Sequence, residues 1–216
     1  MRSAVILGAR NIGGAVAARL LKDGWRVAAV ARSDETLTAV AEQGALALKA
    51  DAAKPRTLSA ALEIAVEEHG GLDLIVNAVH PQRPPQGSPQ WGGPLETMDP
   101  ADFQGWGTAV AEQAYVFLNT GIRALRAAGG GTLVQLTGGS AVSPAAGRGA
   151  WSAGCAAARA LVLAAHEELR DEPVHPCLLV VHGAVESPGE REEIAATVAH
   201  LAEPRSHRSL PEVHLR

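Results

Sequence analysis

Residues 4–14 read Ala-Val-Ile-Leu-Gly-Ala-Arg-Asn-Ile-Gly-Gly, an apolar segment that runs directly into a glycine-bearing turn. The helix expected after the turn begins near Ile12 and carries apolar residues at helical spacing along one face. A buried strand, a tight turn and a helix N-terminus, in this order, can bind the pyrophosphate of a dinucleotide. Gly8 and Gly13 match the outer glycines of the G-x-G-x-x-G pattern, whereas Arg10 stands at its middle position. Because any strand-turn-helix unit favours glycine at its corner, this turn alone leaves the ligand open.

Composition limits the classes of protein to which the chain can belong. The 216 residues are 47% hydrophobic and 19% charged with a net charge of -4, which predicts one globular domain over residues 1–216. Mild acidity without runs of Lys or Arg argues against nucleic acid or an anionic membrane as partner. With neither an export signal nor a membrane-spanning apolar run, we expect a cytoplasmic protein. Cys155 and Cys177 form no metal-like cluster, so no metal site is predicted.

Apolar segments that read as strands recur along the whole chain. They alternate with helical segments, and they lie at residues 4–7, 26–31, 45–49, 72–79, 130–137, 177–182 and 211–215. This alternation predicts an α/β fold, a doubly wound and mainly parallel sheet of about seven strands with helices on both faces. Such sheets bind ligands at the carboxyl ends of their strands.

Polar residues stand at the ends of successive predicted strands. Arg32 ends the second one, where an acidic residue would bind the ribose 2′-hydroxyl of NAD and an arginine suits the 2′-phosphate of NADP. Arg10 in the first turn could reach the same phosphate. Asp51 follows the third strand, where it either accepts a hydrogen bond from the adenine amino group, or caps the next helix, or does both. Asn77 ends the fourth strand.

These residues together resemble the short-chain dehydrogenase/reductase family. The resemblance rests on residues 8–13, Arg32, Asp51 and the Leu-Asp-x-x-Val-Asn-Ala pattern at 72–78, and it continues through the strands at 130–137 and 177–182. It implies a Rossmann fold with a nicotinamide cofactor, for which the two arginines favour NADP(H) over NAD(H). The expected cofactor-binding residues are Gly8, Arg10, Asn11, Ile12, Gly13, Arg32, Asp51, Ala52, Asn77, Ala78 and Gly183.

The same resemblance implies an assembly. In this family the two helices that correspond to residues 100–127 and 151–170 commonly form a bundle between subunits, so we expect a homodimer or homotetramer through them. The second helix carries small residues that permit close approach of another helix, although burial against the protein's own sheet explains part of that pattern.

The residues that carry catalysis in the family are missing. Its reductases use a tyrosine as general acid/base, a lysine four residues later and a serine on the preceding strand. The resemblance places Gly138 at the serine, Trp151 at the tyrosine and Cys155 at the lysine. No shift of register recovers the pair, because Tyr115 is the only tyrosine and no lysine follows Lys54.

Other side chains could handle protons or contact a substrate. His80 follows the fourth strand and is either an acid/base near the nicotinamide or a surface-loop histidine. Tyr115 either directs its hydroxyl into the pocket or packs in the core. His182 stands where the family commonly has a proline, beside Gly183, and either lies near the cofactor carboxamide or is inert. The substrate pocket is expected to be lined by Gly138, Ser140, Trp151 and Cys155.

Three functions remain open at this point. The first is an NADP(H)-dependent reductase that acts on a small electrophilic substrate, such as an imine, a quinone-like compound or a carbonyl, without the Tyr/Lys pair. The second is a non-redox cyclase or isomerase on the same scaffold. The third is a non-catalytic NADP(H)-binding subunit. The chain is short after Gly183, where the family usually inserts helices over the substrate, which predicts an open pocket or one closed by residues 81–94 or by a partner subunit.

Overall fold

The apolar segment that precedes the glycine turn forms β1 (Ser3–Leu7), an interior strand of the sheet. All of its residues are buried, because β2 (Arg26–Ala31) and β4 (Leu74–Asn77) pair with it on its two sides and helices cover both faces. Val5 lies opposite Ile75 of β4, and both side chains belong to the same core. A strand that is buried on both faces needs no alternating polar residues, which explains its continuous apolar sequence.

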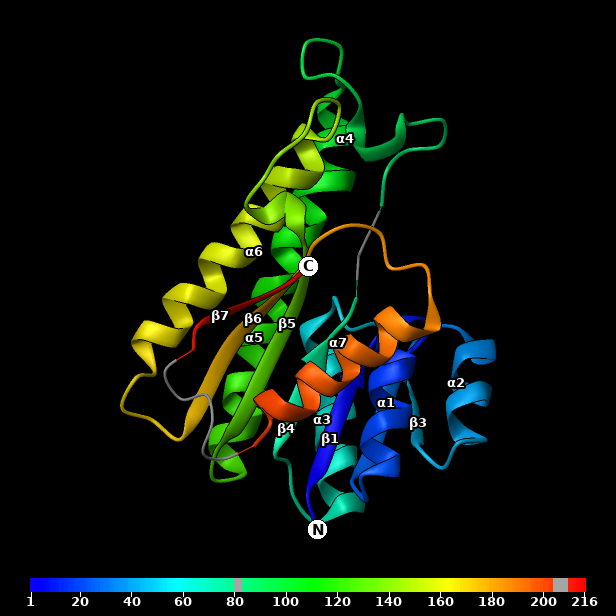
Figure 1. Ribbon diagram of the computed structural model, residues 1–216, viewed down its shortest axis with the longest axis vertical. Coiled ribbons are helices and arrows are strands. Elements are labelled where there is room, and N and C mark those ends of the chain that lie inside the picture. The colour runs from blue at the N-terminus through cyan, green and yellow to red at the C-terminus, as the bar shows by residue number, and fades with distance from the viewer. Residues whose placement is uncertain (80–82, 204–209) are drawn as a thin grey trace.

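The computed structural model describes residues 1–79, 83–203 and 210–216 (Figure 1). These residues form a seven-stranded sheet in the order β3-β2-β1-β4-β5-β6-β7, in which every neighbouring pair is parallel. The predicted doubly wound α/β fold is therefore confirmed. The remaining strands are β3 (Leu46–Lys49), β5 (Gly131–Gly138), β6 (Val174–Val181) and β7 (Glu212–Leu215).

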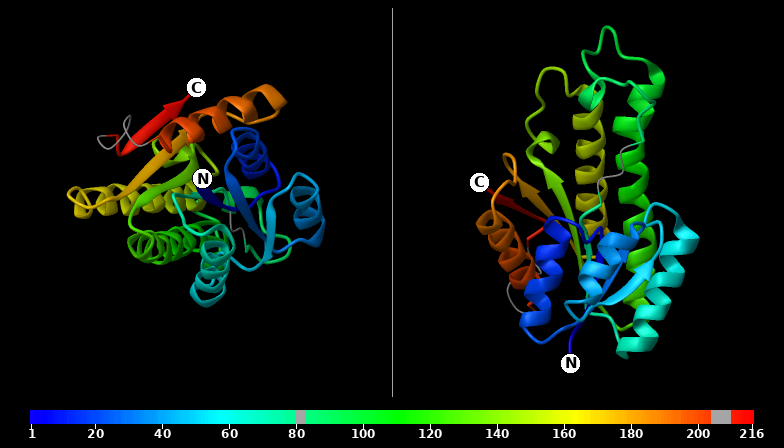
Figure 2. Two further views of the ribbon diagram at one scale, coloured as in Figure 1. Left: turned by 90° about the horizontal axis from the view of Figure 1, so that it is seen from below. Right: turned by 90° about the vertical axis from the view of Figure 1, so that its right-hand side faces the viewer.

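Helices cover the two faces of the sheet in separate layers (Figure 2). One layer consists of α1 (Ile12–Lys22), α2 (Asp34–Ala41) and α7 (Pro188–Leu201). The other consists of α3 (Pro55–His69), α5 (Ala109–Ala127) and α6 (Gly149–Glu168). Each layer buries its own apolar cluster against the sheet, with Val16 and Ile194 on the first side and Phe117 and Val162 on the second. In the described parts of the chain, no helix is both long and apolar enough to cross a membrane.

The helix predicted over residues 100–127 contains an irregular turn. It consists of α4 (Pro100–Phe103), a π-helical turn at Gln104–Thr108 and α5. A Cβ at Gly105 would lie 2.5 Å from the backbone oxygen of Arg83, and one at Gly107 would lie 2.7 Å from a backbone oxygen at the start of α6. The two glycines therefore allow the chain after β4 and the N-terminal end of α6 to pack directly on this turn.

The strand order reverses beside β1. From β1 the chain moves outward through β2 and β3, and it then returns to add β4 and the later strands on the other side. The loops that leave β1 and β4 therefore diverge, and they open a crevice at the carboxyl edge of the sheet. This is the place where doubly wound sheets bind dinucleotides.

Candidate functional site

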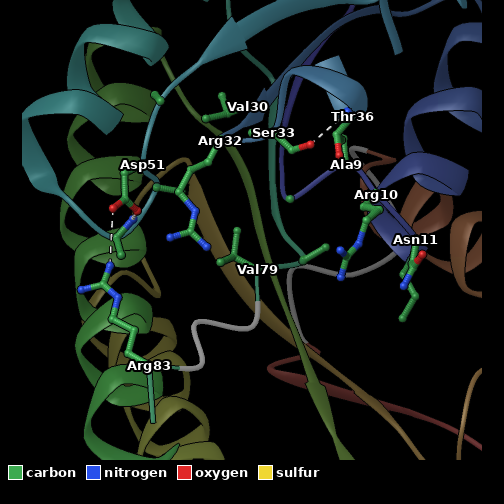
Figure 3. A pocket seen from close by; sticks show the side chains of 17 residues that line it. Ala9, Arg10, Asn11, Val30, Arg32, Ser33, Thr36, Asp51, Val79 and Arg83 are labelled. Atoms are coloured by element: carbon green, nitrogen blue, oxygen red, sulfur yellow. Dashed lines mark hydrogen bonds and ion pairs between the residues drawn. The ribbon is translucent and has the colours of Figure 1, made fainter. Parts of the chain in front are cut away.

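A cavity of about 350 Å³ lies at the carboxyl ends of β1, β2 and β3 (Figure 3). Its walls come from the β1–α1 turn, the ends of β2 and β3, and the chain that follows β4. The lining includes the predicted cofactor-binding residues Gly8, Arg10, Asn11, Ile12, Arg32, Asp51, Ala52 and Ala78. Segments up to seventy residues apart in the sequence thus form one site, as the alternation of strands and helices predicts.

The first turn needs glycine for steric reasons. Gly8 has a φ of +82°, and a Cβ there would lie 3.1 Å from the backbone of Ala78. A Cβ at Gly13 would lie 2.3 Å from the carbonyl oxygen of Gly8, so α1 could not pack so close to the strand end with any larger residue. In the described chain no side chain caps the start of α1, where Asn11 is the N-cap residue. The first N–H groups of α1 are therefore available to an anion.

Two arginine side chains point into the cavity. Figure 3 shows Arg10 entering from the β1–α1 turn and Arg32 from the end of β2. Neither forms an ion pair within residues 1–79, 83–203 and 210–216. Two unneutralised guanidinium groups beside a helix N-terminus make this part of the cavity electropositive, which suits a phosphate group.

On the opposite wall of the cavity, the carboxylate of Asp51 links the end of β3 to the chain that follows β4. Its Oδ1 accepts a hydrogen bond of 3.0 Å from the backbone N–H of Ala53, and its Oδ2 lies 3.4 Å from Nη2 of Arg83. The alternative in which Asp51 caps the next helix is wrong, because α3 begins at Pro55 and its N-cap residue is Lys54. Arg83 is a cavity residue that sequence reasoning missed, since nothing in the Pro-rich segment 81–94 singles out this arginine.

The side chain of Asn77 does not reach the cavity, in contrast to its predicted cofactor contact. It is fully buried, and its Nδ2 donates hydrogen bonds of 2.7 Å to Oε1 of Gln113 on α5 and to Oε1 of Gln135 on β5. Its Oδ1 accepts from Nε2 of Gln113 at 3.1 Å and from the backbone N–H of Val79 at 3.2 Å. Asn77 therefore links three elements beneath the site and fixes the direction in which the chain leaves β4.

The residues predicted for the substrate pocket divide into open and buried positions. β5 ends at Gly138, where an added Cβ would meet no atom within 4 Å. Ser140 is half-buried in the short 3-10 turn that follows. Trp151 and Cys155 are only 6% and 1% exposed, so both are packed in the interior and not on an open pocket wall as predicted.

Trp151 belongs to a cluster of three tryptophans above the start of α6. Its ring centroid lies 4.8 Å from that of Trp91, which in turn lies 5.5 Å from that of Trp106. Trp91 has a φ of +63°, unusual for a residue with a side chain, and the guanidinium of Arg148 lies over its ring. The segment that carries Trp91 thus covers the helix end at which the resemblance expects a catalytic tyrosine.

Cys155 and the predicted acid/base residues lie away from the cavity of Figure 3 or outside the described chain. Burial raises the pKa of the Cys155 thiol, and bonds with Thr137 and the Gly138 backbone offset this only in part, which disfavours a thiolate. Tyr115 is 55% exposed on α5, so it does not pack in the core, and it is not among the residues that line this cavity. His80 lies outside the described residues.

Gly183 lies beyond this cavity. It follows β6 with a φ of +83° and is exposed at the carboxyl edge of the sheet, on the side of β5 and β6. Among the described residues, no group of three or more His, Cys, Asp or Glu side chains could hold a metal ion.

Comparison with known proteins agrees with this geometry. Residues 2–196 match the sequence profile of the family described as short chain dehydrogenase. A metagenomic short-chain oxidoreductase, solved in complex with NADP, is 30% identical and superposes with a TM-score of 0.80 over 100% of this chain and 96% of that chain.

Two structures at lower identity share the fold. The 3-ketoacyl-(acyl-carrier-protein) reductase from Brucella melitensis, complexed with NADH, is 20% identical with a TM-score of 0.84, over 99% of this chain and 96% of that chain. A variant of actinorhodin polyketide ketoreductase with NADPH is also 20% identical, with a TM-score of 0.78 over 99% and 95% of the two chains. With a family match that covers most of its length, this chain belongs to the short-chain dehydrogenase family.

Proposed function

We propose that this protein is an NADP(H)-dependent reductase that acts on a small electrophilic substrate, an imine, a quinone-like compound or a carbonyl, without the family's Tyr/Lys pair. The observation that carries the cofactor assignment is the pair of guanidinium groups, Arg10 and Arg32, that share one cavity and form no ion pair with any residue that the structure describes. The 30% identical metagenomic relative in complex with NADP supports the same assignment.

The cavity residues fit NADP(H) better than NAD(H). A carboxylate at the end of β2 would bind the two ribose hydroxyls of NAD, but Arg32 stands there, and Ser33 directly after it is the N-cap residue of α2. An arginine fork can form two parallel hydrogen bonds with a phosphate, and Arg10 adds a second charge from the other wall. Asp51 remains in position to accept a hydrogen bond from an adenine amino group.

The rest of the chain determines what kind of substrate could react. The cofactor, when bound, supplies a hydride to an electrophilic carbon. The only tyrosine lies at the surface of α5 and the last lysine in the sequence is Lys54, so neither can form the usual acid–base pair at the start of α6. Gly138 provides open space and no hydroxyl group to hold a substrate oxygen. A substrate that is already electrophilic therefore suits this site best.

Titration of the purified protein with NADPH and with NADH tests the cofactor assignment. The four tryptophans provide an intrinsic fluorescence signal. We expect micromolar binding of NADPH and at least tenfold weaker binding of NADH. Equal affinities would refute the phosphate-binding role of the two arginines, and no response to either cofactor would refute the assignment as a whole.

A panel of imines, quinones and ketones then tests the reaction. Oxidation of NADPH that depends on both protein and substrate supports a reductase. Tight NADPH binding without consumption across the panel would favour the non-catalytic subunit instead. Conversion of a compound without net loss of NADPH would favour a cyclase or isomerase.

We further propose that α5 and α6 form a subunit interface in a homodimer or homotetramer. Apolar side chains of both helices are exposed to solvent, namely Tyr115 on α5 and Ala153, Ala156 and Ala160 on α6. Burial of this surface against a second subunit would stabilise the assembly, whereas its exposure does not stabilise a monomer. Light scattering on the wild type and on Ala156→Arg tests this: we expect a dimer or tetramer that the substitution dissociates. A monomeric wild type would refute the interface.

A further inference from the structure

A chain of four polar side chains runs from the carboxyl end of β6 along β7 to its first residue, outside the cavity of Figure 3. His182 directly follows β6, His214 and Glu212 belong to β7, and Arg159 projects from α6. Nε2 of His182 lies 2.9 Å from Nδ1 of His214, and Nε2 of His214 lies 2.8 Å from Oε1 of Glu212. Arg159 binds the same carboxylate through three hydrogen bonds of 2.7 to 3.0 Å.

When both imidazoles are neutral, the hydrogen bonds determine where their protons lie. Arg159 lowers the pKa of Glu212 below its ordinary value, so the carboxylate is ionised and can only accept. It therefore accepts from the Nε2–H of His214, which leaves Nδ1 of His214 as an acceptor. Nε2–H of His182 must then donate to that nitrogen, and the free lone pair of His182 is on Nδ1.

Nδ1 of His182 faces the backbone that follows β5. A Cβ added at Gly139 would lie 2.9 Å from this nitrogen, so the ring packs closely beside Gly139 and only a residue without a side chain leaves room for it. The preceding residue, Gly138, has open space where its side chain would be. Trp151 and Cys155, in contrast, are closed off by packing.

Nδ1 of His182 lies at the part of the sheet edge where the second half of a bound dinucleotide is expected. The cavity with Arg10 and Arg32 lies over β1, β2 and β3, on one side of the point where the strand order reverses. A dinucleotide that crosses this point extends its second half over the ends of β4, β5 and β6. Gly138, Gly139 and His182 lie at that part of the edge.

We propose that His182 is the proton donor in the reduction, and that His214 and Glu212 are positioning residues that hold its tautomer. This inference rests on the proposed function. The substrate carbon accepts the hydride with its two electrons, while the N–H bond at Nδ1 of protonated His182 breaks and an O–H or N–H bond forms on the substrate. NADPH is oxidised to NADP⁺, the substrate is reduced, and His182 regains a proton from water after the product leaves.

The first test needs no turnover. In protein labelled with ¹⁵N-histidine, we expect the neutral His182 ring to carry its proton on Nε2, with signals assigned by their loss in His182→Asn. His214→Ala should remove this preference, and NADPH should shift the His182 signals more than those of His69 at the end of α3. A neutral His182 protonated on Nδ1, or one unaffected by NADPH that is shown to bind, would overturn the proposal.

The second test uses whichever substrate the panel identifies. We expect His182→Ala and His182→Asn to lower kcat by about a hundredfold, the usual size of a general-acid contribution, with the Kd for NADPH unchanged. Added imidazole should restore part of the rate of His182→Ala, because a free imidazole can enter the space left by the ring. His69→Ala serves as the matched control and should retain the wild-type rate.

His214→Ala tests the positioning role. It should lower kcat about tenfold with KM unchanged, and imidazole should not rescue it because the His182 ring still fills its site. Full activity of His182→Ala in a protein that binds NADPH would refute this inference and leave the proposed function intact. Failure of the wild type to bind NADPH would refute the proposed function, whereas the ¹⁵N measurement would still decide the tautomer.

Discussion

Replacement of Arg32 by alanine should weaken NADPH binding selectively. The guanidinium points into the cavity from the end of β2, the residue is exposed, and it has no ionic partner in the described chain, so a bound phosphate would be its main contact. A net hydrogen bond to a charged group contributes about 1.5–3 kcal/mol, and the exposure of Arg32 favours the lower end. Since about 1.4 kcal/mol corresponds to a factor of ten, we expect the Kd for NADPH to rise about tenfold.

The assay is the same fluorescence titration, performed with both cofactors and at two salt concentrations. The Kd for NADH should change less than threefold, because NADH carries no 2′-phosphate at this position, and the loss of NADPH affinity should be larger at low salt. Arg56→Ala, which removes the same charge from the surface of α3, is the matched control and should change neither Kd. A parallel loss of affinity for both cofactors, or no loss at all, would refute the reasoning.

Three further predictions concern the framework of the site. Asn77→Ala should lower the free energy of unfolding by about 3 kcal/mol, because it leaves two buried glutamine oxygens without their donor; a loss below about 1 kcal/mol in urea unfolding would contradict this. Arg159 lowers the pKa of Glu212 in the folded protein below its ordinary value of 4.5. The ionised carboxylate therefore stabilises the fold fully at pH values above 4.5, and this stabilisation is lost as the pH falls through the lowered pKa of the folded state. The difference in unfolding free energy between wild type and Glu212→Gln should therefore shrink from pH 7 to pH 3, and a constant difference would speak against the pair. Burial raises the pKa of the Cys155 thiol and raises that of Cys177 to about 12, so a thiol reagent should label neither at pH 8 until urea unfolds the protein.

The fold was predictable because its signals are local and repeated. Each strand of the sheet is a short apolar run followed by a helix with one apolar face, and this pattern requires parallel pairing with buried strands. The strand order and the irregular turn at Gln104–Thr108 carry weaker signals. The sequence shows glycines at 105 and 107, but only the packed structure shows the backbones of the chain after β4 and of α6 that approach them.

The cofactor half of the site was also largely predictable, because its residues stand at strand ends that converge in any doubly wound sheet. Arg10, Arg32 and Asp51 line one cavity as expected. Asn77 and Arg83 show the limit of this reasoning. Position at a strand end says nothing about which way a side chain turns, so the inward direction of Asn77 could not be read from sequence, and an arginine in a loop carries no periodic signal at all.

The proposed proton donor, His182, lies at the part of the sheet edge where the sequence predicts an open substrate pocket. The connection from β6 to α7 spans only residues 182–187, and Gly183 and Ala184 in it are exposed. On the other side, the tryptophan cluster fills the space at the start of α6. A substrate that approaches the ends of β5 and β6 would therefore come past the short connection, and His182 is the first residue of that connection. A side chain at Gly139 would displace the His182 ring, because an added Cβ would lie 2.9 Å from its Nδ1, and Gly139 does not line the cofactor cavity. Gly139→Val should therefore abolish reduction while NADPH binding is retained; a fully active variant would show that the substrate reacts elsewhere.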